Sequence, residues 1–226
     1  MEKVSIRERL SAFAWHFLFS AVLACLLSIA VFIFWFPGAY RVFGAAEGIL
    51  IFIGIDLVLG PLLTFVVYKA NKVELRRDIA FIVFMQISAF AFGVWTIYQQ
   101  RPYVQVLDYD VLTIYTYDET KSHSLSIPSS SNENFIGPKK FFLYLPQKLT
   151  EIKTIEFVSE FVDKKPFSMR TDLYRTYSEG AQWGLDNLLS RFEKDLVKNC
   201  YWVEVASKHF SGKACIGLDG ELLVVK

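Results

Sequence analysis

Charged side chains are scarce in the first hundred residues of this 226-residue chain. Residues 1–100 carry eight Lys or Arg and six Asp or Glu, whereas the rest of the chain carries 16 and 17. Three apolar stretches account for the difference, namely residues 13–36, 45–68 and 79–98. A helix of about 20 residues crosses a hydrocarbon core of about 30 Å, and soluble core helices are rarely apolar on every face. The scarcity of charge therefore excludes a soluble fold for residues 1–100 and predicts a domain of three transmembrane helices.

A cleavage site is missing after the first apolar stretch. Signal peptides carry an apolar region of about 7–15 residues followed by a small-x-small site. Here the stretch is longer and is closed by Trp35, Phe36, Pro37 and Gly38. We therefore expect a retained membrane anchor.

Basic residues are distributed unevenly over the segments between the apolar stretches. The N-terminal tail has three Lys or Arg, the first loop has Arg41 alone, and the second loop, residues 69–78, has four. Because basic loops remain in the cytoplasm, the pattern predicts a cytoplasmic N-terminus and an external C-terminal half, residues 101–226. In a bacterium this is a multi-pass inner-membrane protein with a periplasmic domain.

The sequence also lacks the marks of several function classes. A net charge of +1 offers no basic stripe for nucleic acid. Neither GxSxG, HExxH, a phosphate-binding loop nor paired CxxC motifs occur. His123 and His209 fall in expected loops and turns. We therefore expect a non-enzymatic protein without cofactor or metal.

The second apolar stretch contains an unusual polar segment. Asp56 lies at its centre, where an ionised carboxylate costs on the order of 2.5–3.5 kcal/mol. Gly60 and Thr64 follow on the same helical face, and Pro61 cannot donate to the carbonyl of Leu57, so we expect a kink in the helix at this polar segment. Gln86 in the third stretch is a polar partner across the helix interface.

Three interpretations of this polar segment remain open. The favoured one is internal packing of the three helices, and the second is docking of a partner's transmembrane helix. A proton or ion path is the least favoured, because the sequence shows none of the internal repeats common in transporters.

Residues 101–226 have the pattern of an α+β domain. Short runs rich in Val, Ile, Tyr and Thr predict strands at residues 103–107, 111–117, 140–145, 201–206, 213–217 and 221–225. Apolar residues at helical spacing predict helices at residues 149–162 and 181–198. Residues 122–138 read as a loop, and Asp219-Gly220 as a hairpin turn.

The three cysteines have different expected roles. Cys25 lies in a membrane span and is expected to pack there. Cys200 and Cys215 fall in strands that we expect to be neighbours, in an oxidising compartment, so a disulfide is the favoured interpretation.

The segment between the two predicted helices is rich in Arg and Tyr, which are enriched at protein interfaces. We interpret Arg170, Tyr174, Arg175 and Tyr177 either as an interface or as an exposed linker.

Short motifs in residues 1–102 resemble those of the type IV pilin accessory proteins, also called pilin assembly accessory proteins. The motifs are Trp15-His16-Phe17-Leu18, Trp35-Phe36-Pro37, the segment from Asp56 to Thr64, Gln86, Gly93-Val94-Trp95-Thr96 and Arg101-Pro102. The resemblance implies a chaperone-like, non-enzymatic inner-membrane protein that stabilises or presents a particular type IV pilin before assembly. The expected partners are then a type IV pilin and the lipid bilayer.

Two other functions remain open. One is a membrane-anchored sensor whose outer domain binds a ligand. The other, an enzyme for lipid-linked substrates, is disfavoured because the first loop offers only Arg41, with Glu47 at the start of the next stretch.

Overall fold

The computed structural model describes residues 6–68, 75–109, 111–128, 136–144, 166–180, 182 and 184–226. It divides the chain into two units. One comprises Met1–Phe32 and Ala45–Tyr98, and the other comprises Ile33–Gly44 and Gln99–Lys226. The first loop, Ile33–Gly44, therefore folds with the C-terminal half, although we expected a boundary at residue 100.

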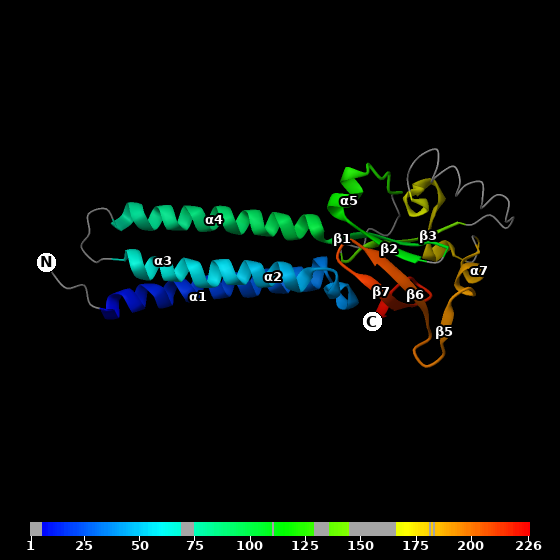
Figure 1. Cartoon of the computed structure of the whole chain (residues 1–226), viewed down its shortest axis with the longest axis horizontal. Helices are drawn as coiled ribbons and strands as arrows, with labels where there is room; N and C mark the ends of the chain where they lie inside the picture. The colour runs from blue at the N-terminus through cyan, green and yellow to red at the C-terminus, as the bar shows by residue number, and fades with distance from the viewer. Residues whose placement is uncertain are drawn as a thin grey trace. The chain divides into compact units, whose positions relative to one another are not determined.

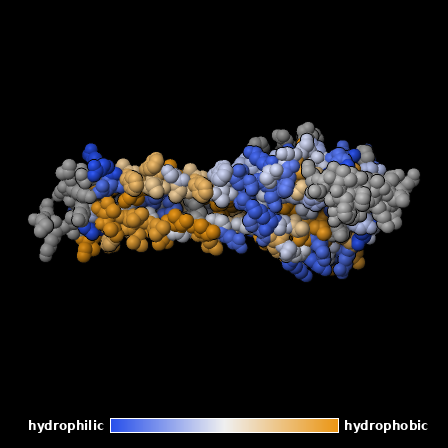
Figure 2. Space-filling view, turned by 45° about the horizontal axis from the view of Figure 1, so that its top comes forward, coloured by the Kyte–Doolittle hydropathy of each residue, from blue (hydrophilic) through white to orange (hydrophobic). Residues whose placement is uncertain are grey.

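The first unit is helical (Figure 1). Its elements are α1 (Ile6–Ala30), α2 (Ala45–Ile53), the π-helical segment η3 (Gly54–Leu59), α3 (Gly60–Val67) and α4 (Leu75–Gln100). A π-helical turn, η1 (Val31–Trp35), extends α1. Among the described residues, three helices are long and apolar enough to cross a membrane, with bounds Ile6–Trp35, Ala45–Val67 and Leu75–Gln100. Figure 2 shows apolar residues covering much of these helices.

The second candidate span changes its hydrogen-bonding pattern near Asp56. The π-helical segment η3 contains Asp56 and ends at Leu59, directly before Gly60 and Pro61. Proline has no N–H to donate to the carbonyl four residues earlier, and π-type turns accommodate such interruptions within α-helices. The hydrogen-bonding pattern of the span therefore changes directly before Pro61, and the predicted kink stays a prediction.

The second unit is built on one sheet. Its strands are β1 (Pro102–Leu107), β2 (Val111–Thr116), β3 (Lys139–Leu143), β4 (Tyr174–Thr176), β5 (Glu193–Asp195), β6 (Cys200–Ser207), β7 (Ser211–Ile216) and β8 (Leu222–Val225). The strand order is β4-β3-β1-β2-β6-β7-β8, and β5 also pairs with β6. The β1–β3 and β2–β6 pairs are parallel, and the others are antiparallel.

The sheet curls so that the turn before β8 approaches β1 and β3. The side chain of Gln105 in β1 donates a hydrogen bond of 2.8 Å to the carbonyl of Gly220. Lys140 in β3 forms an ion pair with Glu221. Neither β1 nor β3 pairs with β8 in the sheet, so only curling brings these groups together.

Successive side chains of a strand point to opposite faces of the sheet, and they form two apolar clusters, one on each face. Within β3, Phe142 contributes to one cluster and Phe141 to the other. Tyr40 and Phe43 belong to the same cluster as Phe142. They come from the short 3-10 helix η2 (Gly38–Val42) and the residue after it, which explains why the first loop belongs to this unit.

The second unit is mostly β rather than the balanced α+β domain that we predicted. Its described α-helices are α5 (Tyr117–Ser122) and α7 (Leu185–Leu189). The predicted loop at residues 122–138 thus starts where α5 ends. The predicted helix at residues 149–162 lies outside the described residues.

The predicted helix at residues 181–198 is wrong beyond Leu189. Strand β5 follows instead, and it pairs with the first residues of β6. Asp195 accepts hydrogen bonds from the backbone N–H groups of Val197 and Lys198, in the turn that joins β5 to β6. Leu196, counted on the apolar face of the expected helix, is 82% exposed.

Candidate membrane docking site

A hydrogen-bonded cluster joins α1 to α3 inside the first unit. The Nδ1 atom of His16 lies 2.5 Å from the Thr64 hydroxyl, and that hydroxyl donates to the carbonyl of Gly60 over 3.2 Å. Either atom can be the donor in the His16–Thr64 hydrogen bond, depending on the histidine tautomer. Thr64 is 7% exposed, so the cluster satisfies buried polar groups of the helix pair.

Gln86 on α4 joins the same cluster. A Cβ atom placed on Gly60 would overlap the side-chain amide of Gln86 and would lie 3.5 Å from Nε2 of His16. Glycine therefore allows the Gln86 amide to approach the backbone of α3. The structure thus brings together Gly60, Thr64 and Gln86, with buried Pro61 beside them, and adds His16, which the sequence analysis did not assign to this site.

Asp56 takes no part in these hydrogen bonds, although His16 lies close enough to interact electrostatically with its carboxylate. None of the described residues donates a hydrogen bond to its carboxylate. The side chain instead borders two cavities, of about 430 Å³ and about 270 Å³. The larger one is bordered by residues of α1 and α4, with His16, Ser20 and Gln86 as its other polar residues.

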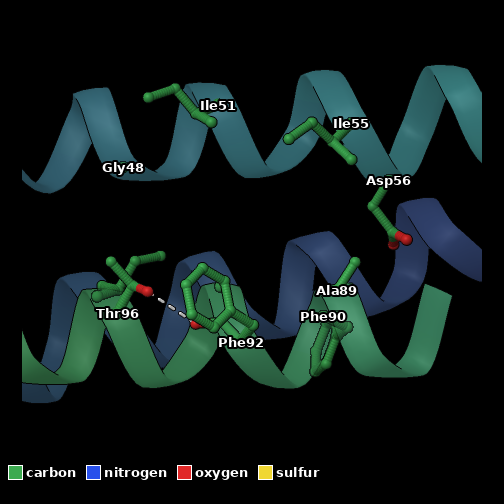
Figure 3. A pocket seen from close by; sticks show the side chains of 10 residues that line it. Gly48, Ile51, Ile55, Asp56, Ala89, Phe90, Phe92 and Thr96 are labelled. Atoms are coloured by element: carbon green, nitrogen blue, oxygen red, sulfur yellow. Dashed lines mark hydrogen bonds between the residues drawn. The ribbon is translucent and has the colours of Figure 1, made fainter. Parts of the chain in front are cut away.

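The smaller cavity has one wall formed by α2 and η3 and another formed by α4 (Figure 3). Its walls include the small residues Gly48, Ala89 and Gly93. Thr96 also borders it, but its hydroxyl donates to the carbonyl of Phe92 over 2.9 Å, so that hydrogen is already used. Asp56 is therefore the charged group that this cavity presents.

Both cavities open to the surroundings of the helix bundle. Their bordering residues include large apolar side chains that are strongly exposed, such as Ile51 (65%), Phe92 (67%) and Ile87 (63%). In a bilayer these residues face lipid or another helix. In the smaller cavity the wall beside Asp56 continues through apolar Ile51 and Ile55 to Gly48, whereas the polar residues His16, Ser20 and Gln86 border the larger one.

The residues proposed as an interface in the second unit differ in exposure. Tyr174 is 3% exposed, stacks on Phe141 at 5.2 Å between ring centroids, and donates to the carbonyl of Ser168. Tyr177 packs edge-on to Phe142 at 5.6 Å. Both tyrosines therefore belong to the packing of the domain rather than to an exposed linker.

The two arginines of that segment are held by local partners. Arg170 forms an ion pair of 2.8 Å with Asp172, and this hydrogen-bonded guanidinium lowers the pKa of the Asp172 carboxyl. Arg175 donates to the carbonyls of Asp172 and Tyr174. An interface through Arg170 and Arg175 remains a prediction.

Cys200 and Cys215 form a disulfide between β6 and β7, with 5.5 Å between their Cα atoms. A carboxylate oxygen of Asp195 lies within 4.8 Å of both sulfurs. Sulfurs bonded to each other offer no thiolate, so this group is not a metal ligand set while the disulfide is formed. Cys25 is a free, exposed cysteine.

Comparisons with known proteins find similarity to fimbrial assembly proteins. Residues 4–43 match the family model of the fimbrial assembly protein FimB. The chain is 37% identical over 102 residues to the fimbrial assembly protein of serogroups C1 and C2 from Dichelobacter nodosus, which covers 44% of this chain and 78% of that protein. It is 36% identical over 102 residues to the serogroup I protein of the same organism, covering 44% of this chain.

The relatives differ in length from the chain described here. The matches cover 40% of the length of the serogroup I and serogroup E1 proteins. No solved structure matches the chain.

Proposed function

Because this chain belongs to the FimB family of fimbrial assembly proteins, we propose that it is a membrane accessory protein that stabilises or presents one type IV pilin before pilus assembly. The single observation that carries the proposal is the identity with a curated fimbrial assembly protein over 78% of that protein's length. The role is chaperone-like and needs no catalytic step.

The proposed topology has a cytoplasmic N-terminus and a periplasmic second unit, in the inner membrane of a bacterium. The basic residues of the N-terminal tail and of residues 69–78 support this orientation. The joint folding of Ile33–Gly44 with Gln99–Lys226 supports a different part of the topology, namely that these two segments lie on the same side of the membrane. Segments that share one core lie on one side of a membrane, which requires an even number of crossings between them. The spans Ala45–Val67 and Leu75–Gln100 are two such crossings.

This arrangement suits a protein that handles a pilin. An unassembled pilin, as the family resemblance implies, has an apolar helix in the inner membrane and a globular head outside. The candidate spans expose apolar surface and two cavities to a neighbouring helix. The curled sheet domain is then available to the head of the same pilin.

Copurification tests the proposal. The tagged full chain is expressed in its own strain, extracted in mild detergent and purified, and the bound proteins are identified by mass spectrometry. A tagged, unrelated inner-membrane protein of similar size is the control. We expect the strain's pilin to be enriched with the full chain and cellular pilin and surface pili to fall when the gene is deleted.

Two results would contradict the proposal. Unchanged pilin levels and piliation in the deletion strain would remove the assembly role. Enrichment of a small ligand without pilin would favour the membrane-anchored sensor.

A further inference from the structure

We propose that the second unit carries a basic face that binds the headgroups of anionic phospholipids at the periplasmic surface of the membrane. The face consists of Arg41, Arg101, Lys121 and Lys208. The inference goes beyond the handling of a pilin. It rests on the proposed topology alone, in which the second unit is joined directly to the candidate spans.

The first loop keeps part of the second unit close to the bilayer. One candidate span ends at Trp35, and the next begins at Ala45. Tyr40 lies five residues from each of them and is 2% exposed in the core of the second unit. Because five extended residues reach at most about 18 Å, this part of the core stays near the headgroups. Arg41, the next residue, is exposed there.

The turn between β6 and β7 contacts residues at the ends of two candidate spans. Nε2 of His209 lies 2.9 Å from Oε1 of Gln100, the last residue of α4. The imidazole ring would also lie 3.3 Å from a Cβ atom placed on Gly44, which directly precedes α2. Lys208 is exposed in the same turn, so its ammonium group is within reach of the headgroups.

Arg101 and Lys121 are held beside one aromatic ring. The guanidinium carbon of Arg101 lies 4.3 Å from the centroid of the Tyr117 ring, and Nζ of Lys121 lies 4.8 Å from the same centroid. Arg101 directly follows Gln100, so this pair of cations also starts at the end of a candidate span. Two cations beside one ring repel each other, and an anion bound between them lowers the electrostatic energy.

Acidic side chains do not cancel the charge of the face. Three of the segments that carry it contain no Asp or Glu, namely residues 33–44, 99–103 and 207–210. The fourth, α5, contains Asp118 and Glu119. Glu119 accepts hydrogen bonds from the N–H and hydroxyl groups of Thr116, so its carboxylate is engaged in the cap of the helix. Together the four segments carry a net positive charge.

The chemistry of the face suits the phosphate of a lipid. A guanidinium binds two phosphate oxygens at once, and an ammonium adds a compact charge. Tyr103 packs edge-on to Tyr117 at 5.1 Å between ring centroids. Tyrosines favour the headgroup level of a bilayer, because they join an apolar ring to a polar hydroxyl. Phosphatidylglycerol offers its phosphate without a compensating cation, whereas phosphatidylcholine carries one, so the face should prefer the anionic lipid.

Photocrosslinking with lipid probes tests this inference. The full chain is reconstituted in phosphatidylethanolamine vesicles that contain a trace of phosphatidylglycerol or of phosphatidylcholine, each with a photoreactive group next to its headgroup. Lipid-modified peptides from residues 99–123 are quantified by mass spectrometry. The ratio of the two yields is compared within each variant, which cancels differences in proteolysis. We expect the phosphatidylglycerol probe to give several-fold more modification.

Two double variants probe the cations. Arg101→Gln with Lys121→Gln should lower the ratio by on the order of 5-fold for each charge removed. Arg101→Lys with Lys121→Arg keeps both charges and should keep most of the preference. The yield of each variant in the membrane fraction verifies insertion.

A matched control removes two other cations. Lys194 and Lys198 also lie over aromatic rings, at 5.6 Å from the centroid of Tyr201 and 5.9 Å from that of Trp202, but outside the segments of the face. Lys194→Gln with Lys198→Gln should leave the ratio unchanged. An equal fall in this control would show a nonspecific effect of net charge and would overturn the inference.

Two further outcomes would overturn it. An unchanged ratio in Arg101→Gln with Lys121→Gln would show that these residues do not select the lipid. A preference abolished by millimolar inorganic phosphate, but not by sodium chloride of the same ionic strength, would assign the face to a soluble phosphate. Neither outcome touches the copurification of pilin, so the accessory role would stand. Conversely, a chain that recovers no pilin but keeps the lipid preference would lose only the accessory role.

Discussion

The hydroxyl of Tyr40 donates a hydrogen bond of 2.5 Å to Oε1 of Gln105, and the Gln105 amide donates in turn to the carbonyl of Gly220. Gln105 has no exposed surface, and Tyr40 is 2% exposed. Three segments far apart in the sequence therefore meet in one buried chain of hydrogen bonds. Such a network is sensitive to the loss of any one member, because the remaining polar groups cannot reach water.

Replacing Tyr40 by Phe should destabilise the second unit. The substitution keeps the ring but leaves Oε1 of Gln105 without its donor, at a cost of about 1–3 kcal/mol. Thermal unfolding of the full chain in detergent, followed by near-ultraviolet circular dichroism, should show a lower midpoint. Tyr109→Phe is the matched control, because Tyr109 is 38% exposed. Equal midpoints for the two variants would show that the Tyr40 hydrogen bond contributes little.

Adding a methyl group at Gly60 should lower the stability of the first unit. The Cβ of Gly60→Ala overlaps the Gln86 amide, and forced overpacking costs typically about 1–3 kcal/mol. The heating temperature at which the detergent-solubilised chain leaves its monodisperse peak in size-exclusion chromatography measures the effect. Gly54→Ala is the control, since nothing lies within 4 Å of its added Cβ.

A second substitution tests the cause of that effect. Gln86→Ala removes the side chain that the new methyl group would meet. The double variant Gly60→Ala with Gln86→Ala should therefore be more stable than the sum of the two single effects predicts. Strict additivity would mean that Gly60 is required for another reason.

Reduction of the disulfide should weaken the second unit. Cys200 and Cys215 are 15 residues apart, and closing a loop of that size is worth about 3 kcal/mol in the chain-entropy model. Unfolding with and without a reductant measures the difference. Thiol alkylation under denaturing conditions should label Cys25 alone before reduction and all three cysteines after it. Three labelled cysteines without reductant would contradict the pairing.

Alkaline pH should unfold the second unit. Burial raises the pKa of Tyr115 to about 12, and burial also raises the pKa of Tyr40, Tyr174 and Tyr177. An unfolded tyrosine loses its proton near pH 10, while the folded group retains it. The unfolded state then binds fewer protons, so stability should be constant below about pH 10 and fall between about pH 10 and 12.

The measurement is the free energy of unfolding as a function of pH. Tyr115→Phe should reduce the slope above pH 10 by up to about 1.4 kcal/mol per pH unit, because one proton no longer differs between the two states. Tyr109→Phe again serves as the control. A stability that stays flat up to pH 12 would contradict the burial of these phenols.

The strands were the most predictable part of the second unit. Runs such as Val111–Thr116 combine β-branched and aromatic residues with turn residues at each end, so local pattern suffices to place them. Helix α5 was missed although Thr116 and Glu119 form a capping box, with hydrogen bonds in both directions. The capping box was overlooked because Thr116 lies in the predicted strand 111–117, and the residues after it lead into the predicted loop 122–138.

The predicted helix at residues 181–198 shows the opposite failure. Leu185, Leu188 and Leu189 are buried as a helical face requires, but the apolar spacing continued by chance through Leu196. Pairing of β5 with β6 and the turn at Asp195 outweighed that local pattern. Long-range pairing of this kind cannot be read from a periodicity.

The candidate site was partly predictable. A carboxylate in an apolar span is conspicuous, and Asp56 was found for that reason. The role of His16 was not found, because its partner Thr64 lies 48 residues away and in another helix. For the same reason the sequence did not reveal that Tyr40, 65 residues before Gln105, belongs to the second unit.

The meeting of Tyr40, Gln105 and Gly220 also sets an order for biosynthesis. Tyr40 is synthesised early, when most of the chain is still to be made. Its partner Gln105, however, bonds to the carbonyl of Gly220, which lies just before β8 near the end of the chain. In the proposed topology, the segment Ile33–Gly44 must therefore remain without its packing partners while the two following candidate spans are inserted and the sheet is translocated. A chain arrested on the ribosome before residue 220 would lack the carbonyl that completes this network, so the core of its second unit would be unfinished and exposed to proteases.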